Sequence, residues 1–201
     1  SALVSQEKLV ATFTTRRKET IVSGNQSVQT SIARYLVHGT LRLICRPRDI
    51  DGVFRLVTLK NEHTAPLLAG RISVFVTSDY LGKTQLQQLI APNQSFKLPF
   101  GQDNRLSVAR NIWSLKVTNT RDRKRIQCTV RLCAVNRGSM AREIQIEEPL
   151  PISRDNRVKI EFDDVAPKAE QIDETGKATW RLTVAPGDSA VVLIPYKVEY
   201  P

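Results

Sequence analysis

Apolar and polar residues alternate along much of the chain, and the alternation is unbroken over Lys177–Val184. A period of two predicts half-buried β-strands, with one face on a core and the other in water. Trp180 lies on the apolar side of this segment and is therefore an expected core residue. The same alternation occurs at Ile72–Val76, Ile126–Leu132 and Val158–Phe162.

Turn-forming residues separate these segments, at 23–27, 48–52, 91–94 and 185–188. No segment shows a convincing helical stripe of apolar residues. Short alternating strands divided by clusters of Gly, Pro, Asn, Asp and Ser are typical of antiparallel sheets packed in pairs. The sequence therefore predicts an all-β fold, antiparallel, with β-sandwich architecture.

The second half of the chain repeats features of the first. Leu89–Phe100 and Val184–Tyr196 each lead from an apolar residue through Ala-Pro, two turn residues and Ser into a strand that ends in Pro and an aromatic residue. Upstream, a strand leads to Asn61 in one copy and to Asn136 in the other. We therefore expect two sandwich-like halves, residues 1–104 and residues 105–201.

A long hairpin is predicted to join the halves. Leu106–Thr118 has the pattern of one strand, Asn119–Lys124 of a turn, and Arg125–Val135 of the returning strand. In this pairing the apolar residues from Trp113 to Val117 lie opposite those of the returning strand. Trp113 is expected in the core, with exposure as the alternative because its strand bridges the halves.

Positive charge is concentrated on this hairpin. The chain has a net charge of +10, and residues 110–137 hold eight Lys or Arg against one Asp, a local charge of 8 − 1 = +7. Residues 138–201 hold eight against twelve acidic residues, 8 − 12 = −4. The candidate contacts for an acidic polysaccharide or nucleic acid are Arg121, Arg123, Lys124 and Arg125. The alternative is a solvated hairpin whose charges discourage edge pairing, since the turn has no aromatic residue nearby on which bases could stack.

Composition adds few constraints. With 201 residues and 41% hydrophobic residues the chain suits one large or two small β domains. It contains no apolar run of the roughly 18–20 residues that a membrane helix needs, and no signal peptide. Because it opens with SALVSQ and not with methionine, we expect a piece of a longer protein.

The three cysteines are too few and too irregular for a disulfide framework. We expect buried or free thiols, with one disulfide of Cys45 as the alternative, and we expect Cys128 and Cys133 on opposite faces of a strand. A zinc site is not indicated, because no C-x-x-C occurs and His38 and His63 stand alone. No cofactor is predicted.

Several segments come in the order of a known family. They include Leu150-Pro-Ile-Ser-Arg-Asp155, Thr179-Trp-Arg-Leu-Thr-Val-Ala-Pro-Gly187 and Tyr196-Lys-Val-Glu-Tyr-Pro201. From about Ala11 to Pro201 the chain resembles the uncharacterised C-terminal domain of mucoidy-inhibitor-A-like proteins. The resemblance implies a β-rich fold without an assigned activity, preceded in the family by another uncharacterised domain and a coiled coil. The second half also resembles the immunoglobulin-like repeats of bacterial surface proteins.

Ser153, Arg154 and Asp155 stand side by side in the first of these segments. A hydrolase would use Ser153 as nucleophile with His63 or His38 as base, yet no glycine is near enough to form a nucleophile elbow. We interpret the three residues as a turn in which short polar side chains hydrogen-bond their own backbone. If Arg154 and Asp155 do more, we expect a salt bridge that holds a neighbouring loop. Asp163, Asp164, Asp173 and Glu174 form an exposed acidic patch or, as the alternative, a site for a hard cation.

Three functions are consistent with these features. The first is a non-catalytic structural or interaction module that contacts a protein or the N-terminal part of the same chain. The second is a binder of anionic polymer at the hairpin turn. The third and most remote is a serine hydrolase at Ser153. The family context suggests a bacterial periplasm or cell envelope, and the cysteines suit a reducing cytoplasm as well.

Overall fold

The computed structural model describes residues 24, 37–76 and 79–201. Those residues form twelve strands and no helix, so the all-β prediction is confirmed. The strands are β1 (Gly39–Arg46), β2 (Ile50–Lys60), β3 (Gly70–Val76), β4 (Asp79–Leu86), β5 (Ser95–Gln102), β6 (Leu106–Asn119), β7 (Lys124–Asn136), β8 (Arg142–Pro149), β9 (Lys159–Phe162), β10 (Gln171–Ile172), β11 (Lys177–Val184) and β12 (Ser189–Tyr200).

The strands form three open sheets, ordered β10-β11-β8-β1-β2-β5, β6-β7-β12-β9 and β3-β4. The first sheet is mixed, because β1 and β8 run parallel, with Leu43 opposite Ile144 and Cys45 opposite Ile146. The prediction of purely antiparallel strands is therefore wrong for this pair. Alternation along a strand defines its faces but not the direction of its neighbour, and parallel partners need a long connection that leaves no local signal.

The chain divides into two compact units. Among the described residues, the first unit holds 37–41 together with Val57–Pro99, and the second holds Arg42–Leu56 and Phe100–Pro201. The expected halves, 1–104 and 105–201, differ from this division mainly in Arg42–Leu56, which belongs to the second unit. The predicted hairpin does form, as β6 and β7, but it lies wholly in the second unit and does not join two halves.

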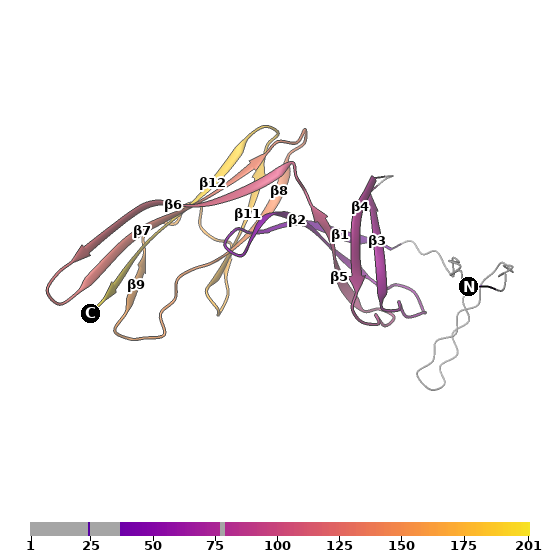
Figure 1. Cartoon of the computed structure of the whole chain (residues 1–201), viewed down its shortest axis with the longest axis horizontal. Helices are drawn as coiled ribbons and strands as arrows, with labels where there is room; N and C mark the ends of the chain where they lie inside the picture. The colour runs from indigo at the N-terminus through magenta and orange to yellow at the C-terminus, as the bar shows by residue number, and fades with distance from the viewer. Residues whose placement is uncertain (1–23, 25–36, 77–78) are drawn as a thin grey trace. The chain divides into compact units, whose positions relative to one another are not determined.

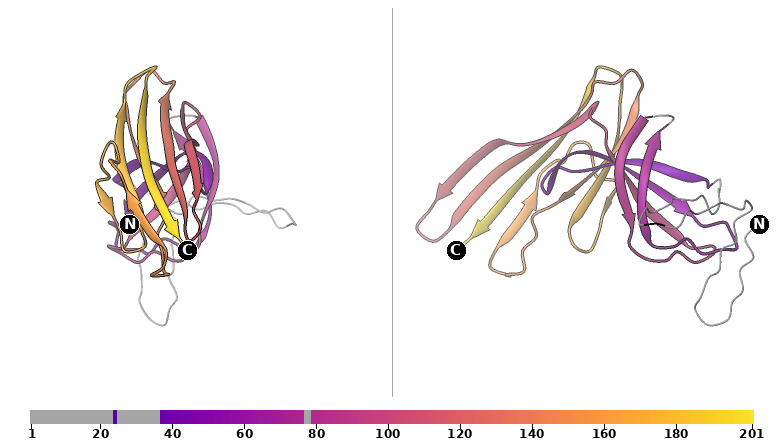
Figure 2. Two further views of the ribbon diagram at one scale, coloured as in Figure 1. Left: turned by 90° about the vertical axis from the view of Figure 1, so that its left-hand side faces the viewer. Right: turned by 45° about the vertical axis from the view of Figure 1, so that its right-hand side comes forward.

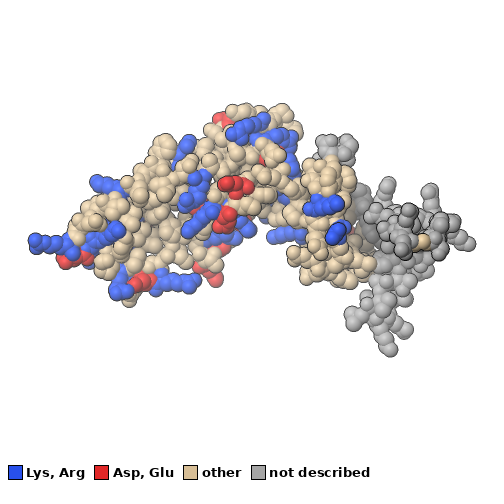
Figure 3. Space-filling model, in the orientation of Figure 1, with Lys and Arg blue, Asp and Glu red and all other residues tan. Residues whose placement is uncertain are grey.

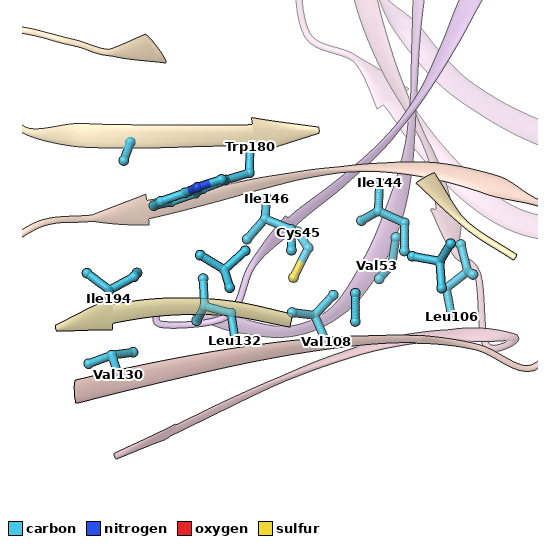
Figure 4. Close-up of a cluster of buried hydrophobic side chains, with 14 of the residues drawn as sticks. Cys45, Val53, Leu106, Val108, Val130, Leu132, Ile144, Ile146, Trp180 and Ile194 are labelled. Atoms are coloured by element: carbon cyan, nitrogen blue, oxygen red, sulfur yellow. The ribbon is translucent and has the colours of Figure 1, made fainter. Parts of the chain in front are cut away.

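The core of the second unit lies between two of its sheets. Figure 4 shows Cys45, Ile144, Ile146 and Trp180 of one sheet directed toward Val108, Leu132 and Ile194 of the other. Trp180 is 1% exposed, and its Nε1 donates to the Pro167 carbonyl oxygen at 2.9 Å, so the prediction of a core tryptophan is confirmed. A buried indole needs such a partner for its single N–H.

All three cysteines carry free thiols. Cys45 and Cys128 are buried and Cys133 is half-buried. Burial, with smaller effects of Glu148 and Asp51, raises the pKa of Cys45 to about 12. Cys128 belongs to the core, whereas Cys133 Sγ lies 3.8 Å from Arg131 Nη2, so the two face opposite sides of β7 as expected.

The two units share one local structure, built on a fully buried asparagine. In the first unit Asn61 Nδ2 donates to the carbonyl oxygens of Ala65 (3.0 Å) and Ile90 (3.2 Å), and its Oδ1 accepts from the amide of His63. The amide of Asn61 also donates to Gln94 O at 2.9 Å. The Asn61 side chain thus joins the turn after β2 to Ile90, in the segment between β4 and β5.

Asn136 makes the corresponding bonds in the second unit. Its Nδ2 donates to the carbonyl oxygens of Met140 (2.8 Å) and Val184 (3.0 Å), and its Oδ1 accepts from the amide of Gly138 (2.9 Å). Its backbone amide donates to Asp188 O at 3.0 Å. In both copies the near partners lie two and four residues after the asparagine, and the two distant partners lie four residues apart. This agreement matches the internal repeat expected from the sequence.

The Ala-Pro turns complete the repeat. Each places its third residue at positive φ, Asn93 at 63° and Gly187 at 72°, and closes with an amide bonded to the carbonyl three residues earlier. Proline followed by a residue of positive φ defines a type II turn. The amides of Asn93 and Gly187 donate to the carbonyls of Asn61 and Asn136, respectively.

A buried carboxylate fixes the turn between β5 and β6. Asp103 is 3% exposed, and its side chain accepts two hydrogen bonds from Arg105 at 3.0 Å and pairs with Arg55 Nη2 at 2.8 Å. Its amide donates to Val53 O. The hydrogen bond from Arg105 is the largest reason that the pKa of Asp103 falls to about 2, and it outweighs the opposing effect of burial.

Candidate interaction surface

The four-stranded sheet of the second unit extends past its core. In Figures 1 and 2 the ends of β6, β7, β12 and β9 run beyond β8 and β11. The buried cluster reaches Cys128 on β7, and farther along the same face Ile126 is only half-buried and packs against the margin of the cluster. Residues on one face of a sheet follow each other two apart along a strand and directly opposite across strands.

Two apolar rows cross this uncovered end of the sheet. The strand register aligns Leu115, Cys128, Tyr196 and Phe162 in one row. It aligns Val117, Ile126, Val198 and Ile160 in the next row. We define the hairpin face as the exposed or half-buried residues of these rows on β6, β9 and β12, together with Ile112 of the adjacent row: Ile112, Leu115, Val117, Ile160, Phe162 and Val198.

Strand β6 contributes the most exposed part of this surface. All nine residues from 111 to 119 are exposed, and they include Ile112 (58%), Trp113 (65%), Leu115 (59%) and Val117 (48%). Ile112, Leu115 and Val117 are on the apolar face, since they pair with Val130, Cys128 and Ile126. Three large exposed apolar side chains on one face of one strand differ from the single exposed apolar residues that are ordinary on protein surfaces.

Trp113 is not in the core, so the expectation of burial is wrong and its exposed alternative is right. The ladder between β6 and β7 shifts between Ile112 and Ser114, which leaves Trp113 as the extra residue of a β-bulge. Its ring lies 5.0 Å from the guanidinium carbon of Arg131. Strict alternation predicted a buried position because the bulge, which changes the phase of the strand, has no mark in the sequence.

The opposite face of the same strands is charged. Arg125 of β7 pairs with Glu199 of β12, and Lys197 Nζ lies 2.9 Å from Asp163 Oδ1. These residues alternate along their strands with the apolar rows. One end of the sheet is therefore apolar on one side and charged on the other.

The basic turn between β6 and β7 carries less free charge than its sequence suggests. Figure 3 shows Lys and Arg at the tip of the hairpin with acidic residues beside them. Glu199 pairs with Arg125 and lies 3.8 Å from Arg123. The net charge of the turn together with Glu199 is therefore 4 − 2 = +2, from the four cations Arg121, Arg123, Lys124 and Arg125 and the two carboxylates Asp122 and Glu199. The sequence interpretation missed Glu199 because it lies 74 residues from Arg125.

An aromatic ring does lie beside the basic turn. Lys124 Nζ is 5.6 Å from the centre of the Tyr200 ring, because Tyr200 is opposite Lys124 in the ladder of β7 and β12. The expectation of a turn without a nearby aromatic residue is therefore wrong, again through a partner distant in the sequence.

A hollow of about 350 Å³ connects the basic turn with the segment after Ser153. It is lined by Arg123, Asn156, Arg157, Lys159, Glu199, Tyr200 and Pro201. Three cations meet there, although Glu199 is part of the same wall. The basic turn and the segment that follows Ser153, which are far apart in the sequence, thus lie on the same hollow.

Ser153 itself lies in a turn that it stabilises. Its hydroxyl donates to Asp155 O at 2.8 Å and its Oγ accepts from the Asp155 amide at 3.1 Å. Asp155 pairs with Arg157 of the same turn, with Nη2 2.8 Å from Oδ2, and not with a neighbouring loop as expected. Arg154 is exposed. The pKa of Asp155 is lowered, chiefly by the hydrogen bond from the Arg157 side chain.

Two adjacent glutamates of β8 are buried, a feature that alternation did not reveal. Glu148 lies on the core side, 2% exposed, with Oε1 accepting from Arg110 Nε at 2.8 Å, and burial raises its pKa despite that bond. Glu147 on the other side accepts from Arg46 and Gln145. Burial raises the pKa of Glu147, but Arg46, Lys177 and Gln145 together bring it below the usual value.

Two of the four acidic residues proposed as a cation site, Asp163 and Asp173, bind other groups of the protein. Asp163 pairs with Lys197, and Asp173 accepts hydrogen bonds from Thr175 and from the amide of Lys177. Among residues 37–76 and 79–201 no group of three His, Cys, Asp or Glu side chains is arranged to hold a metal ion. That same part of the chain contains no helix able to cross a membrane.

Comparison with known proteins adds a family but no activity. The profile described as Domain of unknown function (DUF4139) matches residues 3–201. Protein F37C4.5 of Caenorhabditis elegans is 24% identical over 218 residues, which cover all of this chain and 38% of the worm protein. The chain thus spans about two fifths of the curated relative that it matches. No solved structure matches the chain.

Proposed function

Given that the chain belongs to the DUF4139 family, a family of unknown function, we propose that it is a non-catalytic interaction module that binds a protein segment through the hairpin face. One observation carries the proposal: residues 111–119 are all exposed and include three large apolar side chains on the hairpin face, Ile112, Leu115 and Val117. The partner is another protein or another part of the same longer protein. The extra length of the worm relative supports the second source.

The magnitude of the exposed apolar surface supports binding. Complete burial of a large apolar side chain stabilises by about 1.5–3 kcal/mol. Ile112, Leu115 and Val117 of the hairpin face are each about half exposed, so covering them would contribute on the order of 3 kcal/mol before the costs of association. This free energy is sufficient for a low-affinity interface, and burial of the rest of the hairpin face would raise the affinity further.

The proposal includes finer assignments of fold and family. We take the second unit as an immunoglobulin-like β-sandwich, supported by one buried cluster to which two sheets contribute. We also take the family resemblance to mucoidy-inhibitor-A-like proteins as part of the proposal, supported by the Leu150–Asp155 and Thr179–Gly187 segments. A periplasmic, cell-envelope or cytoplasmic location stays a prediction.

Cross-linking in the full-length protein tests the proposal. Leu115→Asp places a charge in the hairpin face and should abolish cross-links between strand β6 and the bound segment. Leu68→Asp is the matched control, since Leu68 of the first unit is 53% exposed and Leu115 is 59% exposed. Unchanged cross-links in Leu115→Asp would contradict the proposal, as would labelling by an active-site serine probe that Ser153→Ala removes.

A second candidate, binding of anionic polymer, is favoured by the hollow at Arg123, Arg157 and Lys159. Reversal of the charges of Arg121, Arg123, Lys124 and Arg125 should then abolish retention on heparin at low salt. The pairing with Glu199 reduces the charge available and makes this the weaker candidate.

A further inference from the structure

Strand β6 ends its sheet with an unpaired edge. In the described part of the chain β6 pairs with β7 alone and stands first in the order β6-β7-β12-β9. Beyond the bulge at Trp113, Ser114–Asn119 pairs with β7 in regular register and is exposed throughout. The edge therefore presents a row of amides and carbonyls that another strand can pair with.

The side chains of this edge do little to prevent pairing. Natural proteins protect edge strands with lysine, proline, inward charges, β-bulges or very short strands. Beyond the bulge at Trp113 this edge has only a lysine among these features. Ser114–Asn119 has one charge, Lys116, which lies on the side opposite Leu115 and Val117 according to the register with β7. An added strand could place apolar residues next to Leu115 and Val117 and other residues next to Lys116.

Charge indicates the chemistry of the added strand. Residues 110–137 carry a net charge of +7, and the chain as a whole +10. A second copy of this chain pairing through the same edge would bring the same positive charge beside it, which opposes association. A strand with acidic residues would instead complement Lys116 and the basic turn.

We propose that the occupant of this surface is an extended segment of alternating apolar residues with an acidic flank, which adds as a fifth strand beside Ser114–Asn119. Its main chain pairs with β6, its apolar side chains extend the hairpin face, and its acidic flank lies toward Lys116 and the β6–β7 turn. Peptide recognition by strand addition takes its affinity from main-chain bonds and its specificity from alternate side chains. This inference rests on the proposed function and specifies its partner.

Tryptophan emission supplies a direct readout. The chain has two tryptophans, Trp180 in the core at 1% exposure and Trp113 at the start of the free edge at 65% exposure. An added strand that continues past Ser114 would lie next to Trp113 and reduce its exposure, and it would leave Trp180 unchanged. Binding should therefore shift the emission to shorter wavelength, and Trp113→Phe should remove that shift without preventing binding.

The experiment titrates the 201-residue chain with a nine-residue peptide, which consists of six residues of alternating threonine and valine followed by three glutamates. Two control peptides differ from it in one respect each: alternate backbone nitrogens are methylated, or the glutamates are replaced by lysines. We expect the emission shift with the first peptide, and an affinity lower by about tenfold or more with each control. Lys116→Glu should reverse the preference between the acidic and basic flanks.

The outcomes separate this inference from the proposed function. Equal binding of the methylated peptide would overturn strand addition, and equal binding of the lysine peptide would overturn the acidic partner. Absence of a shift at up to about 1 mM peptide, or a stable dimer of the chain through β6, would overturn both parts of the inference. The loss of cross-links in Leu115→Asp would still support the proposed function in each case.

Discussion

Replacing Asn136 with alanine should destabilise the second unit strongly, although it removes no apolar contact. The side chain is fully buried and makes three hydrogen bonds, to Met140 O, Val184 O and the Gly138 amide. Each such bond contributes about 1 kcal/mol net, and groups left unpaired in a buried site add to the loss. The expected decrease in the free energy of unfolding is therefore about 3 kcal/mol, or roughly 6–12 °C in Tm for a chain of this length.

Urea unfolding followed by tryptophan fluorescence measures this decrease in the second unit, because Trp113 and Trp180 both belong to it. The control is Asn111→Ala, since Asn111 is exposed and its replacement should change stability by less than about 0.5 kcal/mol. Asn61→Ala should weaken the first unit similarly, seen as faster amide exchange in 57–99. A decrease below about 1 kcal/mol for Asn136→Ala would refute the reasoning that these bonds hold the turn.

Three further predictions follow from other parts of the structure. Asp103→Asn should lower the free energy of unfolding by about 2 kcal/mol near neutral pH, because the pKa of Asp103 is about 2 in the folded state and near 4 in the unfolded state. This stabilisation is present above pH 4 and is lost as the pH falls toward 2, so acid unfolding curves of the variant and the wild type should converge near pH 2. A thiol reagent should modify the half-buried Cys133 in the native state and reach buried Cys45 and Cys128 only on unfolding; mass spectrometry that finds Cys45 modified first would contradict this. Gly187→Asn should be nearly neutral, since Asn93 adopts the same positive φ in the first unit, whereas Gly187→Val should cost about 1–2 kcal/mol by thermal unfolding.

Alternation and repetition were sufficient to predict much of the fold. The apolar side of Lys177–Val184 placed Trp180 in the core, and the runs on either side of Asn119–Lys124 predicted β6 and β7 within a residue or two. The parallel Asn61 and Asn136 segments predicted the internal repeat. Each of these signals is local, because the face of a strand and the chemistry of a turn are set by neighbouring residues.

What the sequence could not show depends on distant partners. Glu199 reduces the charge of the basic turn, Tyr200 lies beside Lys124, and β1 runs parallel to β8, all through pairings between strands far apart along the chain. The bulge at Trp113 is the exception, a local change that altered which side of β6 is exposed. The candidate surface therefore became visible only once the pairing of the strands was known.

The divided course of the second unit affects the order in which it can fold during synthesis. Leu43 and Cys45 pair with Ile144 and Ile146, 144 − 43 = 101 residues later, and the whole of Val57–Pro99 is made in between. At 5–20 residues per second, about 5–20 s pass before β1 can meet β8 on the growing chain. The first unit can fold in that interval, whereas β1 of the second unit stays unpaired with β8 until β8 has been synthesised. Pairings so distant in sequence also slow folding after the chain leaves the ribosome, because a long loop must close before its contacts can stabilise the structure.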